Sequence, residues 1–335
     1  MDLSTTYMGM SLKNPLVPSA APVSESVDKI RQMEDAGAAA VVMFSIFEEQ
    51  VRQEEQLLDD RLAAGTESFA ESLSYFPAGG DYHVGPDAYL ELIRKAADAT
   101  DIPIIGSLNG VSHEGWISYA RRIQEAGAKG LELNVYYIPT DPKLTGAVVE
   151  QEYLDILKAV KSAVTIPVAL KIGPYFSSMA NMAQQFDQAG ADALVLFNRF
   201  YQPDLDLENM TVASTLNLST PEDIRLPLRW IAILHGRIKA SLAATTGVHG
   251  AREAVKYLLA GADVVMTTAA LLKKGLRHLT TLVEDLDNWL EENEYESVRQ
   301  MKGILSQKTV ADPAAFERAN YIKILEKYKT EYRMI

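Results

Sequence analysis

Short apolar runs follow a repeated small-residue phrase along much of the chain. The phrase Ala-Gly-Ala occurs at 36–38, 126–128, 189–191 and 260–262, and an apolar run begins directly after each copy. Glycine at such a point supplies the left-handed conformation that ends a helix, and the flanking alanines allow a helix and a strand to pack closely. Each copy therefore predicts a helix end followed by a strand, and four copies predict a repeated βα architecture.

Further apolar runs begin after a proline or a polar break, as at Asn14-Pro15, Ile102-Pro103 and Ile166-Pro167. Together with the first set they predict eight strands, near positions 16, 41, 104, 131, 168, 194, 241 and 264. Eight strands with intervening helices predict an α/β protein with a single (β/α)8 barrel domain over residues 1–335. A doubly wound open sheet is the alternative, but no strand is followed by the GxGxxG pattern that would favour it.

Three segments exceed what a barrel needs. Residues 48–89 form a long predicted insertion after the second strand, and residues 199–229 form another after the sixth. Long loops at the strand ends of a barrel are usually lids or binding elements. The C-terminal tail, from roughly 280 to 335, is charged and amphipathic, and it predicts one or two helices packed outside the barrel.

Composition removes several classes of function. The chain has 32 Lys and Arg against 45 Asp and Glu, and the resulting net charge of −13 argues against nucleic acid or an anionic membrane as partner. It has no cysteine, which excludes disulfides, thiolate nucleophiles and cysteine-ligated metals within the chain. The five histidines lack paired spacing, so no metal site is expected. No apolar run is long enough for a membrane span and no signal peptide is evident, so a cytoplasmic location is expected.

The stretch 166–198 carries the strongest indication of a site. Lys171 stands near the end of the apolar run 168–172, where a buried strand should not hold an unpaired charge. Asn198 stands just after the apolar run 193–197 in the next unit. Because ligands of parallel α/β proteins bind at the carboxyl ends of the strands, these two polar side chains are expected in one pocket.

Motifs at the strand ends follow one another in a recognisable order. They are SLKNPLVPSAAPVS, IIGSLNGVSHEGW, LELN, ALKIGPYFS, an asparagine after the sixth strand, ATTGVHG and VVMTTAALLKKG. Together they resemble the dihydroorotate dehydrogenase family, in particular its soluble class 1 branch, over most of the chain, and ALKIGPYFS is the most specific part. The resemblance implies an FMN-binding barrel, commonly a homodimer, that oxidises or reduces a carbon–carbon bond of a small, anionic substrate.

The resemblance also assigns roles to strand-end residues. Lys171 matches the lysine that stabilises the negative charge developing on the flavin during reduction. The alternative is a lysine that extends along the barrel wall to a structural partner. Asn134 and Asn198 match asparagines that hold the flavin edge and the substrate through both donor and acceptor groups. Either could instead cap a helix or a turn.

Other residues match the parts of the family that surround the cofactor. Thr246-Gly247 and Thr267-Thr268 follow the last two strands, where barrels bind phosphate, although turn chemistry alone could explain each pair. Ser19, Ala20 and Ala21 match the first-strand loop beneath the flavin, and small residues are also common in tight turns. Tyr75 lies in the first insertion, where the family places a loop over the substrate. Arg199 could meet an anionic substrate or pair with acidic residues of 204–208.

The sequence departs from the family where the substrate reacts. After Asn134 the family continues to a Cys or Ser that takes the substrate proton, whereas Tyr137 occupies that position here. Its phenol could donate a proton as a neutral acid, or its ring could simply pack over the flavin. A family lysine after the second strand is replaced by Phe44, and the glycine-rich segment after the sixth strand is absent. These departures argue against dihydroorotate as the substrate more than they argue against flavin binding.

Two functions of different classes therefore remain open. One is an FMN-dependent oxidoreductase of the dihydroorotate dehydrogenase type with another substrate. The other is a barrel that binds flavin or a phosphate ligand without redox turnover, which loss of the usual base favours. A third reading is a lyase or isomerase in which Lys171 forms a Schiff base with substrate.

Overall fold

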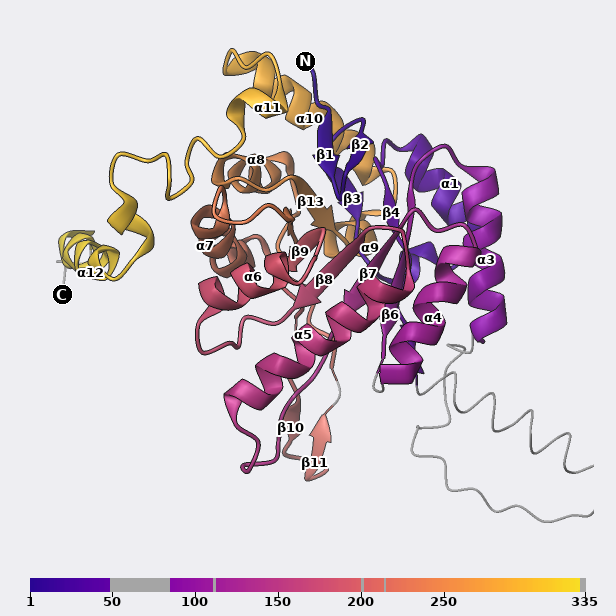
Figure 1. Cartoon of the computed structure of the whole chain (residues 1–335). Coiled ribbons are helices and arrows are strands. Elements are labelled where there is room, and N and C mark those ends of the chain that lie inside the picture. The colour runs from indigo at the N-terminus through magenta and orange to yellow at the C-terminus, as the bar shows by residue number, and fades with distance from the viewer. Residues whose placement is uncertain (49–84, 111–112, 200–201, 214, 332–335) are drawn as a thin grey trace, which may run out of the picture.

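Eight parallel strands form the centre of the molecule and close on themselves (Figure 1). The computed structural model describes residues 1–48, 85–110, 113–199, 202–213 and 215–331. The spatial order of the strands is β3-β13-β12-β9-β8-β7-β6-β4. Their bounds are β3 Leu16–Pro18, β4 Val41–Val42, β6 Ile104–Asn109, β7 Gly130–Asn134, β8 Val168–Ile172, β9 Ala193–Leu196, β12 Ser241–Ala244 and β13 Val264–Thr267.

The two ends of this strand order meet. The backbone N–H of Ala39, just before β4, donates to the carbonyl of Leu16 in β3 at 3.1 Å. The (β/α)8 barrel is therefore confirmed, and each of the eight positions predicted from the sequence lies within one of its strands. A short strand, β5 Ile46–Phe47, extends the second βα unit and pairs with the end of β6.

Helices surround the strands. The glycine of each Ala-Gly-Ala phrase has a positive φ, between +96° and +118°, so all four predicted helix stops are confirmed. The helices are α1 Val27–Asp35, α3 Pro86–Ala99, α4 His113–Glu125, α5 Gly146–Ala163, α6 Met179–Gln188, α7 Arg225–Leu234, α8 Ala251–Ala260, α9 Ala269–Lys274, α10 His278–Glu292, α11 Val298–Met301 and α12 Ala319–Glu331, with short 3-10 turns η1 Pro22–Ser24, η2 Pro221–Ile224 and η3 Pro313–Phe316.

An N-terminal hairpin fills the end of the barrel where the strands begin. It consists of β1 Thr5–Tyr7 and β2 Met10–Leu12, and its buried Tyr7, Met8 and Leu12 join the cluster of inward-facing strand residues. The backbone N–H of Met8 donates to the hydroxyl of Ser241, at the start of β12, at 3.2 Å. The interior is thus packed at this end, which leaves the carboxyl ends of the strands for a site.

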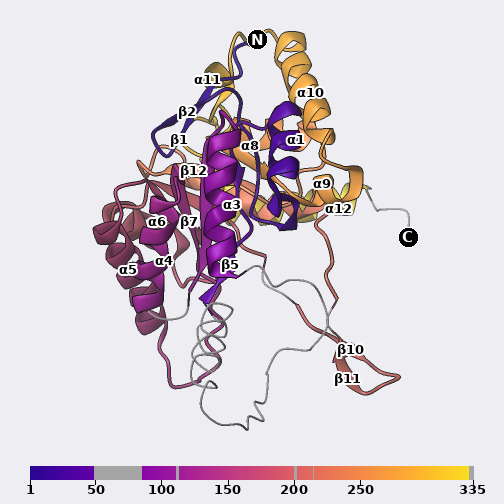
Figure 2. The same cartoon turned by 90° about the vertical axis from the view of Figure 1, so that its right-hand side faces the viewer.

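Both insertions are shorter than the sequence suggested. The first ends by Gly85, since Pro86 begins α3, and its residues 49–84 lie outside the described part of the chain. The second ends at Thr220, because Thr220 and Asp223 form a capping box with Pro221 at the first helical position. Its described part contains an antiparallel hairpin, β10 Asp204–Asp206 and β11 Thr211–Ala213, which projects below the barrel (Figures 1 and 2).

The C-terminal helices behave differently from one another. Helix α10 buries Leu279, Leu282, Leu286 and Leu290 against the barrel, as the amphipathic pattern predicted. Helix α12 stands apart from the barrel in Figure 1, and its side chains from 321 to 328 are exposed. The prediction of one or two packed helices is therefore confirmed by α10 and by the short α11, which buries Val298 and Met301, whereas α12 is a further helix that does not pack on the barrel.

Candidate functional site

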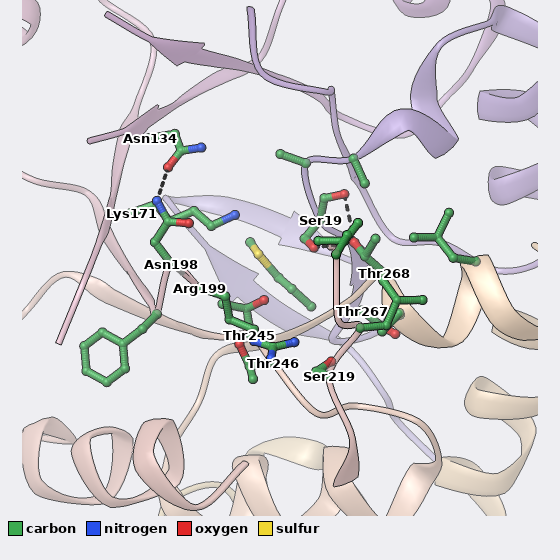
Figure 3. A pocket seen from close by; sticks show the side chains of 18 of the residues that line it. Ser19, Asn134, Lys171, Asn198, Arg199, Ser219, Thr245, Thr246, Thr267 and Thr268 are labelled. Atoms are coloured by element: carbon green, nitrogen blue, oxygen red, sulfur yellow. Dashed lines mark hydrogen bonds between the residues drawn. The ribbon is translucent and has the colours of Figure 1, made fainter. Parts of the chain in front are cut away.

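A cavity of about 500 Å³ opens at the carboxyl ends of the barrel strands (Figure 3). Residues at or just after the ends of β3, β6, β7, β8, β9, β12 and β13 line it, together with the segment that surrounds the β10–β11 hairpin. This is the position at which barrels of parallel strands bind their ligands. The cavity includes ten predicted residues: Ser19, Ala20, Ala21, Asn134, Lys171, Asn198, Thr246, Gly247, Thr267 and Thr268.

A buried ion pair lies in the wall of this cavity. Nζ of Lys171 on β8 is 3.3 Å from Oε1 of Glu132 on the neighbouring strand β7. Lys171 is 8% exposed, and Glu132 is fully buried. The ammonium therefore reaches the cavity from within the barrel, with a carboxylate behind it. Removing either charge alone would leave the other buried without its partner, which is costly.

Glu132 has a second oxygen directed into the packed interior. Its Oε2 has no hydrogen-bond partner among the described residues, and the buried hydroxyl of Tyr7 likewise has none. Burial, followed by the negative charges of Glu132 and Asp263, raises the pKa of Tyr7 well above its ordinary value. The carboxylate is thus held in a place of low polarity, where its attraction for Lys171 is little screened.

Two asparagines meet beside the lysine. Nδ2 of Asn198 donates to Oδ1 of Asn134 at 2.6 Å, and Nδ2 of Asn134 donates to the hydroxyl of Ser45 at 3.3 Å. The Ser45 hydroxyl is in turn 2.8 Å from that of Ser107 on β6. The hydrogen-bond chain fixes the orientation of both carboxamides, and Figure 3 shows them beside Lys171. The sequence prediction that Lys171 and Asn198 share one pocket is consistent with this arrangement.

Hydroxyl groups line the opposite wall. The hydroxyls of Ser19 and Thr268 are 2.6 Å apart, and the Thr267 hydroxyl donates to the carbonyl of Val248 at 2.9 Å. Ser19 follows β3, whereas Thr267 ends β13 and Thr268 is the N-cap residue of α9. The Ser19–Thr268 hydrogen bond joins the first and last barrel units at the cavity (Figure 3), and the Thr267–Val248 hydrogen bond joins the last unit to the loop after β12.

The loop after β12 brings backbone close to the cavity. Thr246 and Gly247 have φ of +85° and +76°, and the hydroxyl of Tyr257 holds the Thr246 carbonyl at 2.9 Å. A Cβ at position 247 would lie 2.6 Å from Cγ2 of Ile224 and 2.9 Å from the carbonyl oxygen of Thr220. Only glycine satisfies both the conformation and the space at this position.

The charges of the cavity are of one sign. Lys171 and Arg199 are cationic, and no Asp, Glu or His is among the described residues that line the cavity. Arg199 donates to the carbonyl of Asn217 at 3.1 Å, which holds its guanidinium at the rim. A cationic cavity in a chain of net charge −13 favours an anionic ligand.

The two neighbouring tyrosines after β7 take different positions. Tyr136 lines the cavity, whereas Tyr137 is not among its lining residues and lies close enough to Tyr153 of α5 to affect it. Burial, followed by the charges of Glu152 and Tyr137, raises the pKa of Tyr153 to about 12. The proposed acid or packing role of Tyr137 over the flavin stays a prediction, and the geometry favours Tyr136 as the tyrosine nearer to a ligand.

Some candidates lie elsewhere, and some site residues were missed. Tyr75, which the resemblance places in a loop over the substrate, lies outside the described residues. Asn109, at the end of β6, lines the cavity but was not singled out. Like Asn134, it is a polar residue at the end of a buried strand, and this pattern could have identified it. The hydroxyl of Ser219 accepts a hydrogen bond from the backbone N–H of Gly247 at 3.3 Å, and nothing in the local sequence around Ser219 indicates this contact.

The strands and the site together define a (β/α)8 barrel protein with a cationic cavity at its strand ends. The sequence model for dihydroorotate dehydrogenase matches residues 2–290, and the chain belongs to this family. Similar proteins include the dihydroorotate dehydrogenase B (NAD(+)) catalytic subunit of Thermoplasma acidophilum, with 27% identity over 90% of this chain and 98% of that protein. The NAD-dependent dihydropyrimidine dehydrogenase subunit PreA of Escherichia coli K12 is 24% identical over 92% of this chain and 78% of its own length.

Within the described residues, no helix has both the length and the apolar character needed to cross a membrane. The same part of the chain also contains no group of three or more His, Asp or Glu side chains arranged to hold a metal ion.

Proposed function

We propose that the protein is an FMN-dependent oxidoreductase that acts on a carbon–carbon bond of a small anionic substrate. The relatives named above are dehydrogenases of dihydroorotate and dihydropyrimidines, which supports an oxidoreductase. The observation that carries the proposal is Lys171, an ammonium held by a buried carboxylate at the end of β8 and open to the cavity beside two asparagines.

The cavity residues fit FMN in three respects. The small side chains of Ser19, Ala20 and Ala21 leave room for a flat ring system on one wall. Lys171 supplies a positive charge, as reduction of the ring requires. Elsewhere in the cavity wall, the loop after β12 brings Thr246 and Gly247 to the cavity, and the neighbouring Ser219 offers a hydroxyl to a phosphate. The volume of about 500 Å³ lies in the range usual for cofactor pockets.

When bound, FMN would accept a hydride from the substrate or return one to it. Lys171 would stabilise the negative charge of the reduced form, and Glu132 would hold its ammonium in place. Asn134 and Asn198 would orient substrate through fixed carboxamides, because each is already restrained by a hydrogen bond. Arg199, at the rim, would attract an anionic group of the substrate.

One observation favours a second candidate function. The substrate must lose or gain a proton as well as a hydride, but no thiol, imidazole or carboxylate lies among the described residues that line the cavity. Tyr136 is the ionisable phenol in that set. A barrel that binds flavin or a phosphate ligand without redox turnover would need no such group. The homodimer and the cytoplasmic location stay predictions under either function.

The visible absorption spectrum of the purified protein tests the proposal first. A bound-flavin spectrum, with FMN released on denaturation, is the expected result. Anaerobic mixing with dihydroorotate, dihydrouracil and related saturated acids should then bleach the flavin with at least one of them. A protein that remains colourless after incubation with added FMN would overturn the proposed cofactor. Flavin that is bound but bleached by no substrate, in a sample where light reduces it, would establish the second candidate.

A further inference from the structure

The ionisable side chains of the cavity are proton donors rather than proton acceptors. Among the described residues that line it, they are Tyr136, Lys171 and Arg199. An ammonium and a guanidinium cannot take a proton from a carbon atom, because they already hold all the protons they can bind. A phenol ordinarily ionises only near pH ~10, so at neutral pH it is a donor too. This set of side chains can therefore give a proton to carbon but is poorly suited to remove one.

Tyr136 is the donor that can release its proton without leaving a buried charge unpaired. Lys171 is the partner of the fully buried Glu132, and loss of its proton would leave that carboxylate alone in the barrel wall. The guanidinium of Arg199 is not deprotonated in proteins. Of the three, only the phenol of Tyr136 is therefore a suitable acid.

The pairing of β7 with β8 brings Tyr136 to the side of the cavity that carries Lys171. Asn134 is the register partner of Lys171, and the backbone N–H of Val135 donates to the Lys171 carbonyl at 3.2 Å. Side chains alternate along an extended chain. Accordingly, Val135 is buried in the core, whereas Asn134 and Tyr136 both line the cavity. The phenol thus follows the Asn134 carboxamide on the same face of the chain.

Arg199 supplies a second cation, separate from the buried ion pair. Its Nη1 donates to the carbonyl of Asn217 at 3.1 Å, which leaves other N–H groups of the planar guanidinium for a carboxylate. The side chain is exposed at the cavity rim, directly after Asn198 (Figure 3). A carboxylate held there would lie at the end of β9, within the same cavity as the phenol.

We propose that the protein works in the reducing direction, on a small α,β-unsaturated carboxylic acid, with Tyr136 as the catalytic acid; this rests on the FMN-dependent function proposed above. The substrate takes a hydride from reduced FMN at Cβ and a proton from the Tyr136 hydroxyl at Cα, so that its C=C bond becomes a single bond. Arg199 stabilises the negative charge that spreads from Cα into the carboxylate. Water returns a proton to the phenolate, and a reduced nicotinamide supplies the hydride that restores reduced FMN.

Anaerobic stopped-flow absorbance of the FMN-loaded protein tests the direction and the acid. At least one of crotonate, tiglate and cinnamate should reoxidise photoreduced flavin about 100-fold faster than dihydroorotate or dihydrouracil bleaches oxidised flavin. Tyr136→Phe should slow this reoxidation by about 100-fold. Tyr321→Phe, which changes an exposed tyrosine of α12, is the matched control and should keep the native rate. Native rates in Tyr136→Phe, or faster reaction of the two saturated compounds, would overturn the proposal.

Binding without turnover tests the class of substrate. In titration calorimetry of the oxidised protein with no reductant present, cinnamate should bind about 30-fold more tightly than its uncharged amide, cinnamamide. Arg199→Gln should remove most of this difference, whereas Arg229→Gln, at an exposed position of α7, should retain it. Tyr136→Phe should bind cinnamate within about 2-fold of native, because the phenol acts in proton transfer. Equal affinity of the native protein for the acid and the amide would overturn the proposed substrate class.

Failure of the cofactor assignment and failure of the reduction give different results. A protein that stays colourless after incubation with FMN contradicts the proposed function before any acid is added. A protein that binds FMN and is reduced by light, but is reoxidised by none of the three unsaturated acids, contradicts the reducing direction and leaves the cofactor assignment intact.

Discussion

The ammonium of Lys171 and the carboxylate of Glu132 face each other across neighbouring strands of the barrel wall, with 3.3 Å between Nζ and Oε1. One member opens to the cavity, whereas the other is fully buried. The pair therefore places a positive charge at the proposed cofactor site and fixes its position from within the core.

Replacing Lys171 with methionine should abolish most turnover while the barrel stays folded. Methionine fills similar space but cannot stabilise the charge of the reduced cofactor, so flavin reduction should slow by on the order of 10²–10³-fold. Stopped-flow absorbance of the flavin measures this rate. Lys158→Met, on the exposed face of α5, is the matched control and should keep the native rate. A rate within about 3-fold of native in Lys171→Met would contradict the role.

Breaking the ion pair from the other side should cost stability. Glu132→Leu leaves the ammonium without its partner, and we expect a loss of about 3 kcal/mol in the free energy of unfolding. The double variant Glu132→Leu/Lys171→Met removes both charges and should recover much of that loss. Urea unfolding of the two single variants, the double variant and the native protein gives the coupling energy. Strict additivity of the two single changes would show that the pair is not coupled.

Gly247→Ala should disturb the loop after β12. The new Cβ meets Ile224 and the carbonyl of Thr220 at 2.6 and 2.9 Å, and the positive φ adds strain. We expect the free energy of unfolding to fall by about 2 kcal/mol or more, and the affinity for FMN to fall because this loop lies in the cavity wall. Gly9→Ala is the comparison, since Gly9 has φ of +75° with no atom near the new Cβ. It should show the strain alone, about 1 kcal/mol. Equal losses in the two variants would refute the crowding at 247.

The two tyrosines after β7 should respond differently to removal of their hydroxyls. Tyr136→Phe changes a cavity residue, and if this phenol transfers the substrate proton the rate should fall by about 10²-fold. Tyr137→Phe changes a residue outside the cavity lining and should leave the rate within about 2-fold of native. Steady-state kinetics of both variants on an accepted substrate measures these rates. A large loss in Tyr137→Phe with a native rate in Tyr136→Phe would instead identify Tyr137 as the acid.

Alkaline conditions should destabilise the fold through Tyr153. Its pKa is raised to about 12 in the folded protein, from an ordinary value of 10, so the unfolded chain releases the proton first. The contribution is constant below the unfolded value and is lost as pH rises from about 10 toward 12. By pH 11 the native protein should lose about 1.4 kcal/mol more than Tyr153→Phe, as measured by denaturant unfolding at both pH values. Parallel curves for the two proteins would show that Tyr153 ionises equally in both states.

The barrel was predictable because its signals are local. Each Ala-Gly-Ala stop ends one helix and precedes one strand, and a residue such as Lys171 is conspicuous in an apolar run. The pairing of Lys171 with Glu132 was not predictable, because the register between β7 and β8 decides which side chains meet. Likewise, Tyr136 and Tyr137 are equivalent in the sequence, and only the path of the chain after β7 directs one toward the cavity.

The exposure of the apolar face of α12 could not be predicted from the sequence, for a related reason. Its stripe of Tyr321, Ile324, Leu325 and Tyr328 has the same periodicity as the buried face of α10. Periodicity identifies a helix with one apolar face, but it does not say whether the barrel covers that face.

The hairpin β1–β2 closes the end of the barrel at which the strands begin. Among the described residues, Tyr7, Met8 and Leu12 pack the end opposite to the cavity, where Met8 is also held by Ser241. A small molecule at the carboxyl end therefore cannot leave by passing through the barrel. Under the proposed function, a substrate would therefore reach the cofactor from the side of the carboxyl strand ends, and its product would leave on that same side.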